Sequence, residues 1–478
     1  MTSGSSHRSL RARLADIDAE TIILHARLAA LAAERKPIVE ALRSATYPVI
    51  DLPAEITAEI FLQYFTRAQI GGTEPGVAVC RKWREIALAL QPIWSKFYVV
   101  TRSTVPSSLG NLLEYWLQRA GTHPLDVSLF HADISVLTLL EPYMGQLETF
   151  ECFARTELGL PNELLQGKIP NLRSLTITCG DEVTVPITAF VGCLQLRELC
   201  LASFPPAGMD ISWGHLTRLE LIDMSLDESL TILRDTPALQ TLTANIYEHM
   251  DDPIPATTSI RLTQLHTLKF DKYHRSLQLL EHLTLPSLAD IEFPLADVNT
   301  HFGMLNLTSD VPRFAACLQR SACNLRSITL HAPGLSDAVQ CLRAAGPTLA
   351  VINLRDVDWD SRSVDHFFRE SLKDTEGFVP GLTSLSINPC LKAVEIPFGE
   401  LASVIAARRG KLRAFELVLA GERSDGGRQP LVEIEDGLDA LRALKKDGVK
   451  IDIRGLQSIT DPVDPLAVYP PMLPRQDD

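Results

Sequence analysis

Histidine and cysteine side chains are the residues of this chain best suited to act as nucleophiles, proton carriers or metal ligands. The chain has twelve histidines and nine cysteines among its 478 residues. The cysteines form no C-x-x-C pair, and no histidine pair has metal-ligand spacing next to a carboxylate. The sequence also contains no phosphate-binding glycine loop and no G-x-S-x-G motif. We therefore expect a non-catalytic protein with no cofactor and no metal.

Charge and composition exclude further classes of function. The net charge of −14 disfavours nucleic acid as a partner, because binding the phosphate backbone needs a basic surface. No apolar run reaches the roughly 18 residues of a membrane span, and the N-terminus does not look like a signal peptide. Most of the odd number of cysteines fall within apolar patterns, which is typical of free thiols in a reducing compartment. We expect a protein of the cytoplasm or nucleus, with two or three domains.

Large apolar side chains between residues 52 and 94 have spacing that could bind another protein. Two short helices are predicted, the first beginning near Pro53, which suits the first turn of a helix. In the second helix, Val79, Trp83 and Ile86 recur at helical spacing and form one stripe. A helix pair of this size cannot bury all its large apolar side chains within itself. We therefore expect a protein partner to cover part of it.

The residues of this stretch resemble an F-box, most closely that of the large F-box families of mushroom-forming fungi. The resemblance is carried by Leu52-Pro53-x-Glu55-Ile56, Glu59-Ile60-Phe61, Cys80-x-x-Trp83-Arg84-x-Ile86-Ala87 and Pro92-x-Trp94. It implies an F-box over residues 46–98 that docks onto the Skp-family adaptor of a cullin-based, SCF-type ubiquitin ligase. One departure is a short, Gly-rich loop before Val77, where many F-boxes have a Leu-rich helix. The alternative is a buried helical hairpin that caps the next domain. The implied adaptor contacts are Leu52, Pro53, Ile56, Ile60, Phe61, Val79, Cys80, Trp83 and Ile86.

The N-terminal segment has the pattern of a long helix. Residues 1–6 are rich in Ser, Gly and Thr, and we expect them to be disordered. Residues 7–45 carry apolar residues at alternating steps of four and three, which is typical of a coiled coil. Thr21 and Arg35 occupy two gaps in this seam, and Pro37 predicts a kink or a restart. Two interpretations remain open, a coiled-coil arm for self-association and a single helix folded back on the body. The apolar seam is Leu10, Leu14, Ile17, Leu24, Leu28, Leu31, Ile38 and Leu42.

A repeat begins after residue 105: a leucine, an apolar residue three later, and another two after that. Its first leucines are 20 to 37 residues apart, mostly within the leucine-rich-repeat range of about 20–29. Alternation over the last three positions predicts a short strand with one buried face. We therefore expect an α/β fold over residues 105–455, an irregular leucine-rich-repeat solenoid of parallel strands with helical returns. The repeats are Leu147-Phe150-Cys152, Leu172-Leu175-Ile177, Leu196-Leu199-Leu201, Leu216-Leu219-Leu221, Leu239-Leu242-Ala244, Leu265-Leu268-Phe270, Leu288-Ile291-Phe293, Leu325-Ile328-Leu330, Leu349-Ile352-Leu354, Leu382-Leu385-Ile387 and Leu412-Phe415-Leu417.

The repeats resemble the irregular leucine-rich repeats of F-box proteins, although the asparagine of the usual repeat is mostly missing. The alternative is an ordinary α/β domain with Leu-rich strands. Leu125-Val127-Leu129 and Val449-Ile451-Ile453 are predicted to open and close the sheet, and Phe97 to Arg102 to form an extended exit from the F-box. Residues 456–478 are a Pro-rich tail. The helical returns are predicted at Thr188 to Leu194, Glu228 to Arg234, Arg313 to Gln319, Ser336 to Ala344 and Leu401 to Arg408.

Polar residues alternate with the buried strand positions and should share the concave face of the solenoid. Most of the charged ones are acidic. This face is either simply solvated or a recognition surface for a protein target with a basic segment. The resulting hypothesis is a substrate receptor, in which the F-box binds the ligase and the repeats bind an unknown target. The alternative is a repeat scaffold that joins no ligase. The candidate target contacts are Glu198, Glu220, Thr243, Lys269, Glu292, Asn353 and Glu416.

Overall fold

A computed structural model describes most of the chain, in several segments. The chain divides into two compact units. One unit comprises Met1–Thr66 with Thr73–Ile93, and the other Arg67–Gly72 with Trp94–Asp478. No helix among the described residues is both long and apolar enough to cross a membrane. The described residues are 3–44, 52–65, 67–70, 80–100, 107–130, 134–154, 162–179, 187–203, 209–247, 259–270, 277–295, 311–357, 366–389, 398–418 and 438–454. Val79, the loop around it, and the predicted tail at 456–478 lie outside them.

The first unit is helical. Helix α1 (Ser3–Ser44) begins at Ser3, so it includes part of the Ser/Gly-rich start that we expected to be disordered. It is one helix through Pro37, with no restart there. A single proline removes only one main-chain hydrogen bond, and good helix formers flank it on both sides. Helices α2 (Ala54–Tyr64) and α3 (Arg81–Ala89) are the predicted short pair.

The second unit is built on one large parallel sheet, as the repeat pattern predicted. Fifteen strands of the described residues pair in the order in which they occur in the sequence, and β9 (Ile260–Arg261) and β11 (Leu283–Thr284) form a separate small parallel pair. The strands of the large sheet are β1 (Ala68–Gln69), β2 (Lys96–Val100), β3 (Leu125–Phe130), β4 (Leu147–Ala154), β5 (Ser174–Cys179), β6 (Glu198–Ala202), β7 (Arg218–Ser225), β8 (Thr241–Tyr247), β10 (Thr267–Phe270), β12 (Asp290–Pro294), β13 (Ser327–His331), β14 (Val351–Val357), β15 (Ser384–Pro389), β16 (Ala414–Val418) and β17 (Lys450–Arg454).

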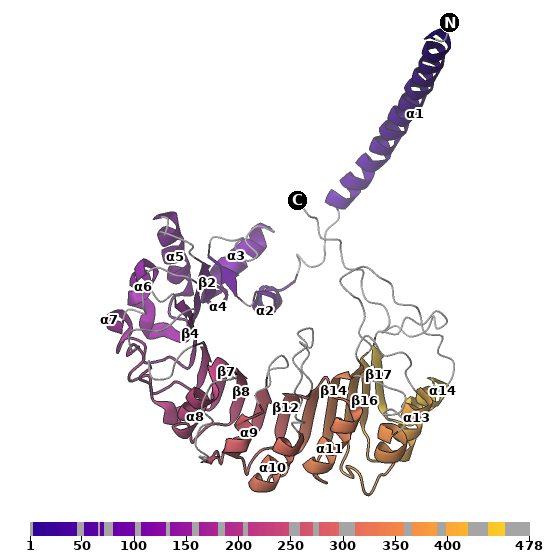
Figure 1. Cartoon of the computed structure of the whole chain (residues 1–478). Helices are drawn as coiled ribbons and strands as arrows, with labels where there is room; N and C mark the ends of the chain where they lie inside the picture. The colour runs from indigo at the N-terminus through magenta and orange to yellow at the C-terminus, as the bar shows by residue number, and fades with distance from the viewer. Residues whose placement is uncertain are drawn as a thin grey trace. The chain divides into compact units, whose positions relative to one another are not determined.

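Helices line the outer side of this curved sheet (Figure 1). Four of the five predicted returns coincide with α8, α10, α11 and α13. The prediction for Thr188 to Leu194 is wrong, because turns replace the helix there and Gly192 has φ +86°. The helical elements are α4 (Gln91–Trp94), α5 (Ser107–Ala120), α6 (Ile134–Leu140), η2 (Glu141–Gln146), α7 (Asn162–Leu165), η4 (Trp213–His215), α8 (Leu226–Arg234), α9 (Leu279–His282), α10 (Val311–Ser321), α11 (Leu335–Ala345), η6 (His366–Leu372), α13 (Phe398–Ala407) and α14 (Leu438–Lys446).

The core of the second unit follows the repeat residue by residue. In adjacent strands Leu175 pairs with Leu199, and Leu199 with Leu219, so equivalent apolar positions stack across the sheet. These residues are at most 2% exposed, and the first leucines of the repeats are buried beside them. One strand alone could not bury this face, but stacked repeats do so together. The mixed α/β fold with a large parallel sheet is therefore confirmed.

Aromatic side chains close the first end of the sheet. Trp94 is fully buried and packs edge-to-face on Trp116 of α5, with 4.7 Å between ring centroids. Phe97, which we expected only to lead away from the F-box, belongs to β2 and is also fully buried. The expected F-box boundary at residue 98 thus lies within a strand of the sheet.

Candidate protein-binding surfaces

Helices α2 and α3 pack through aromatic side chains. Phe61 of α2 is 2% exposed and meets Trp83 of α3 edge-to-face, with ring centroids 5.2 Å apart. Phe65 adds a second edge-to-face contact to Phe61 at 5.7 Å. Lys82 of α3 donates a 3.0 Å hydrogen bond to the Leu52 carbonyl, which ties α3 to the chain just before α2. These contacts fix the orientation of the two helices and so define which residues of α2 point outward.

The ridge of α2 next to the packed residues leaves large apolar side chains open to solvent. Ile56, Ile60 and Tyr64 follow one another at steps of four, and we call them the outward stripe. They are 49%, 41% and 77% exposed. Leu62, on the other side of α2, is 38% exposed. On a helix, residues four apart lie one above the other, so the outward stripe is a continuous apolar surface.

The structure places the predicted adaptor contacts in different environments. Pro53, Ile56 and Ile60 are exposed, whereas Leu52, Cys80, Trp83 and Ile86 are half-buried. Phe61 is buried, so its predicted place at the binding surface is wrong and it serves the packing of the helix pair instead. The Cys80 sulfur accepts a hydrogen bond from the Trp83 main-chain N–H at 3.4 Å and caps α3. Tyr64 fits the same helical spacing but was not among the predicted adaptor contacts, although it is 77% exposed.

Six of the seven predicted target contacts lie in one cross-strand row of the sheet. Register pairs Glu220 with Thr243 and Thr243 with Lys269, and then continues through Glu292 to the later strands. Glu198 lies two residues before this row on its own strand and pairs with Arg218. These side chains alternate with the buried positions, so they share the face that does not carry the apolar core. We call this set the central row: Glu220, Thr243, Lys269, Glu292, Thr329, Asn353, Ser386 and Glu416.

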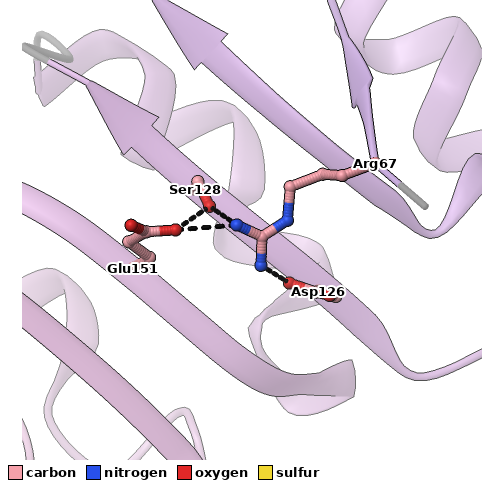
Figure 2. A network of polar contacts seen from close by, with 4 residues as sticks. All are labelled: Arg67, Asp126, Ser128 and Glu151. Carbon is pink, nitrogen blue, oxygen red and sulfur yellow. Dashed lines mark hydrogen bonds and ion pairs between the residues drawn. The ribbon is translucent and has the colours of Figure 1, made fainter. Parts of the chain in front are cut away.

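An arginine network occupies the same face near the first strands (Figure 2). The Arg67 guanidinium binds the Glu151 carboxylate at 2.7 Å and also contacts Asp126 and Ser128. The Ser128 hydroxyl donates to the same Glu151 carboxylate. Arg67 comes just before β1, which pairs with β2. One arginine therefore compensates two carboxylates on neighbouring strands, and the repeat pattern could not reveal it because Arg67 precedes the repeats.

A second cluster surrounds Glu292 in the central row. His331 Nε2 lies 2.8 Å from Glu292 Oε1, while Lys269 and Arg355 reach its carboxylate at 3.6 and 3.5 Å. The hydrogen bond with His331 lowers the pKa of Glu292, and the nearby positive charges add to this, although partial burial opposes it. Asn353 donates to the Thr329 hydroxyl at 3.1 Å. A shallow hollow of about 350 Å³ lies over this cluster, lined by Thr267, Leu268, Lys269, Asp290, Ile291, Glu292, Ser327, Thr329 and Arg355.

These ion pairs revise the expectation of an acidic face. Arg218 lies 3.5 Å from Glu198, and the clusters around Glu151 and Glu292 bring in Arg67, His331 and Arg355. None of these cationic residues was among the positions that we expected to recognise a target. The face is therefore a mixed polar surface in the part of the sheet that these pairs cover, and recognition of a basic target segment stays a prediction.

Two cysteines of the sheet domain, Cys200 in β6 and Cys193 in the turn before it, have little thiolate character. Burial, with the Glu220 and Glu151 carboxylates, raises the pKa of Cys200 to about 12. Burial also raises the pKa of Cys193 to about 11. Since the thiolate is the nucleophile, these two side chains are unreactive near neutral pH. Within the part of the chain that the structure describes, no group of three or more His, Cys, Asp or Glu side chains could hold a metal ion.

Comparison with known proteins adds no assignment. No protein-family model matches the chain, and no curated protein matches it.

Proposed function

We propose that this protein is a non-catalytic adaptor with two binding surfaces, one on a helix pair and one on a repeat sheet. More particularly, we propose a substrate-recognition subunit of an SCF-type ubiquitin ligase, with α2 and α3 as the F-box and the sheet as the target-binding domain. The single observation that carries the proposal is the outward stripe of Ile56, Ile60 and Tyr64, exposed on a helix whose other ridge is packed. Together with the F-box-like sequence, it supports docking onto a Skp-family adaptor.

Proximity supplies the activity in this proposal. The helix pair holds the adaptor and its cullin, and the sheet holds a target protein. Target lysines then lie at a high effective concentration near the ubiquitin-carrying enzyme. The chain itself makes and breaks no covalent bond. The polar central row with its hollow supports the target-binding half, because polar groups arranged on a rigid sheet can give specificity without large conformational cost.

Binding to a purified Skp-family adaptor tests the proposal. The Ile56→Ala/Ile60→Ala variant removes apolar surface that is already exposed, so folding should be preserved. A partner would cover the exposed half of each isoleucine, which corresponds to roughly 1 kcal/mol of lost burial per residue. We expect Kd to rise about tenfold to a hundredfold for the double variant, measured by isothermal titration calorimetry.

The matched control removes exposed apolar surface from the sheet domain. Leu194 is 61% exposed and Val191 is 37% exposed, so Leu194→Ala/Val191→Ala changes a similar amount of open surface elsewhere. Adaptor affinity should be the same as that of the wild type. Equal affinities for both double variants, or no binding by the wild type, would refute the F-box proposal.

A repeat scaffold that joins no ligase is the second candidate. The burial of Phe61 and Trp94 favours it, since both belong to the F-box-like sequence and neither is available at a surface. The adaptor measurement separates the two candidates, because a scaffold has no reason to bind the adaptor at all.

A further inference from the structure

Helix α1 carries a seam of apolar side chains that are exposed to solvent. Leu14, Ile17, Leu24, Leu28 and Leu31 are between 46% and 64% exposed. These residues repeat every seven positions as the a and d residues of a coiled coil. The Thr21 hydroxyl, at a gap in the seam, donates to the Ile17 carbonyl at 2.8 Å. The gap can therefore be buried without leaving that hydroxyl unsatisfied.

The residues that flank the seam have an ordered charge pattern. The g positions, which immediately precede each a position, are Arg13, Glu20, Arg27 and Glu34. Their signs alternate along the helix, and all four side chains are exposed. In coiled coils the charges at e and g select the partner and its orientation.

An antiparallel arrangement of two copies uses this pattern fully. In antiparallel pairs g residues face g residues, so Arg13 of one copy meets Glu34 of the other, and Glu20 meets Arg27. Symmetry repeats both contacts, so all four g–g contacts join opposite charges. The same register places Leu14 opposite Leu31, Ile17 opposite Leu28, and Thr21 opposite Leu24 in the core. The e position Asp18 then faces His25.

A parallel pair of the same helices would place identical polar residues against each other in the core. Identical a residues face each other in a parallel pair, so Arg35 would meet Arg35 of the second copy and Thr21 would meet Thr21. In the antiparallel register Arg35 faces Leu10 of the other copy and not a second Arg35, and Pro37 lies outside the segment from Arg13 to Glu34. That segment spans roughly 30 Å at ~1.5 Å per residue.

We infer that α1 binds a second copy of this chain as an antiparallel two-stranded coiled coil, with Arg13 opposite Glu34 and Glu20 opposite Arg27. The protein would then be a dimer that carries two helix pairs and two repeat sheets. This inference goes beyond the proposed ligase function and does not depend on it, since the α1 seam and the outward stripe are different surfaces.

Charge reversal in the full-length chain tests both the pairing and its direction. The Glu20→Lys/Glu34→Lys variant makes all four g residues positive and turns each g–g contact repulsive. The dimer dissociation constant, measured by sedimentation equilibrium, should rise at least about tenfold. The fourfold variant Arg13→Glu/Glu20→Lys/Arg27→Glu/Glu34→Lys restores opposite charges in the antiparallel register. It should dimerise within about threefold of the wild type.

The fourfold variant is the matched control, because it contains the same two lysines as the double variant. In a parallel pair it would set the glutamate introduced at position 13 against Asp18 and would not recover. A monomeric wild type, an unchanged dimer in the double variant, or a fourfold variant that stays monomeric would each overturn the inference. Helix content measured by circular dichroism checks that α1 is retained in every variant.

Discussion

Large apolar side chains are buried in the repeat sheet but partly exposed on the helix pair. Along the sheet, Leu175, Ile328 and Ile352 are completely buried by neighbouring repeats. On α2, Ile56 and Ile60 have the same chemistry but stay about half exposed. Each repeat of the sheet buries its apolar face against neighbouring repeats. A short helix pair has too few neighbouring elements to bury all its apolar faces. The exposed apolar surface on α2 is therefore available to a binding partner, whereas the buried apolar residues of the sheet are not.

The largest expected effect concerns a buried arginine in the sheet domain. Arg408 is 1% exposed and donates hydrogen bonds of 2.6 to 3.0 Å to the carbonyls of Leu372, Asp374, Phe378 and Val379. The Arg408→Met variant leaves those four acceptors without this donor. We expect the free energy of unfolding, measured with urea, to fall by about 3–5 kcal/mol.

Its neighbour provides the control. Arg409 is 60% exposed and pairs with Asp447 at 3.1 Å. Because exposed ion pairs contribute little, Arg409→Met should cost less than about 1 kcal/mol. Similar losses for Arg408→Met and Arg409→Met would show that the buried hydrogen bonds do not stabilise this part of the sheet domain.

One substitution made in both regions sharpens the contrast directly. Ile328→Ala opens a cavity in the stacked core and should lower the free energy of unfolding by about 2–4 kcal/mol. Ile60→Ala removes a half-exposed side chain and should cost less than about 1 kcal/mol. Thermal and urea unfolding of the two variants measure both values. A larger loss for Ile60→Ala would mean that this residue belongs to a core.

The smallest effect is the pH dependence contributed by Glu292. Its pKa is lower in the folded chain than the value of about 4.3 for an unfolded glutamate. Its stabilising contribution is therefore complete above the unfolded pKa and is lost as the pH falls through the lower folded pKa. Compared with Glu292→Gln, the wild type should lose more stability between about pH 5 and pH 3. A difference between the two proteins that does not change with pH would contradict the role given to the His331 hydrogen bond.

The sheet could be predicted from the sequence because its repeat is local. Three apolar positions within six residues define each strand, and Leu199 or Leu385 needs only its equivalents in adjacent repeats to be buried. The repeat pattern did not predict Phe97 as a core residue, because β2 lacks the leading leucine of the repeat. Thr188 to Leu194 failed for a different reason, since Gly192 adopts a left-handed conformation that ends helical structure.

The candidate surfaces were harder to predict because they depend on distant contacts. The sequence placed Phe61 and Ile60 together on the binding surface, but packing against Trp83 separates them into a buried and an exposed residue. Arg67 lies 84 residues from its Glu151 partner, so no local pattern connects them. Periodicity predicts which positions share a face of a strand, but the charge of that face depends on pairs across strands.

The most direct test of whether the adaptor binds the helix pair and not the sheet is hydrogen–deuterium exchange. It is measured on the full-length chain with and without a purified Skp-family adaptor. We predict slower exchange in α2 and α3 when the adaptor is present, with unchanged exchange in strands β5 to β16. Protection confined to the sheet, or no protection anywhere at saturating adaptor, would contradict the assignment of the helix pair as the ligase-binding surface.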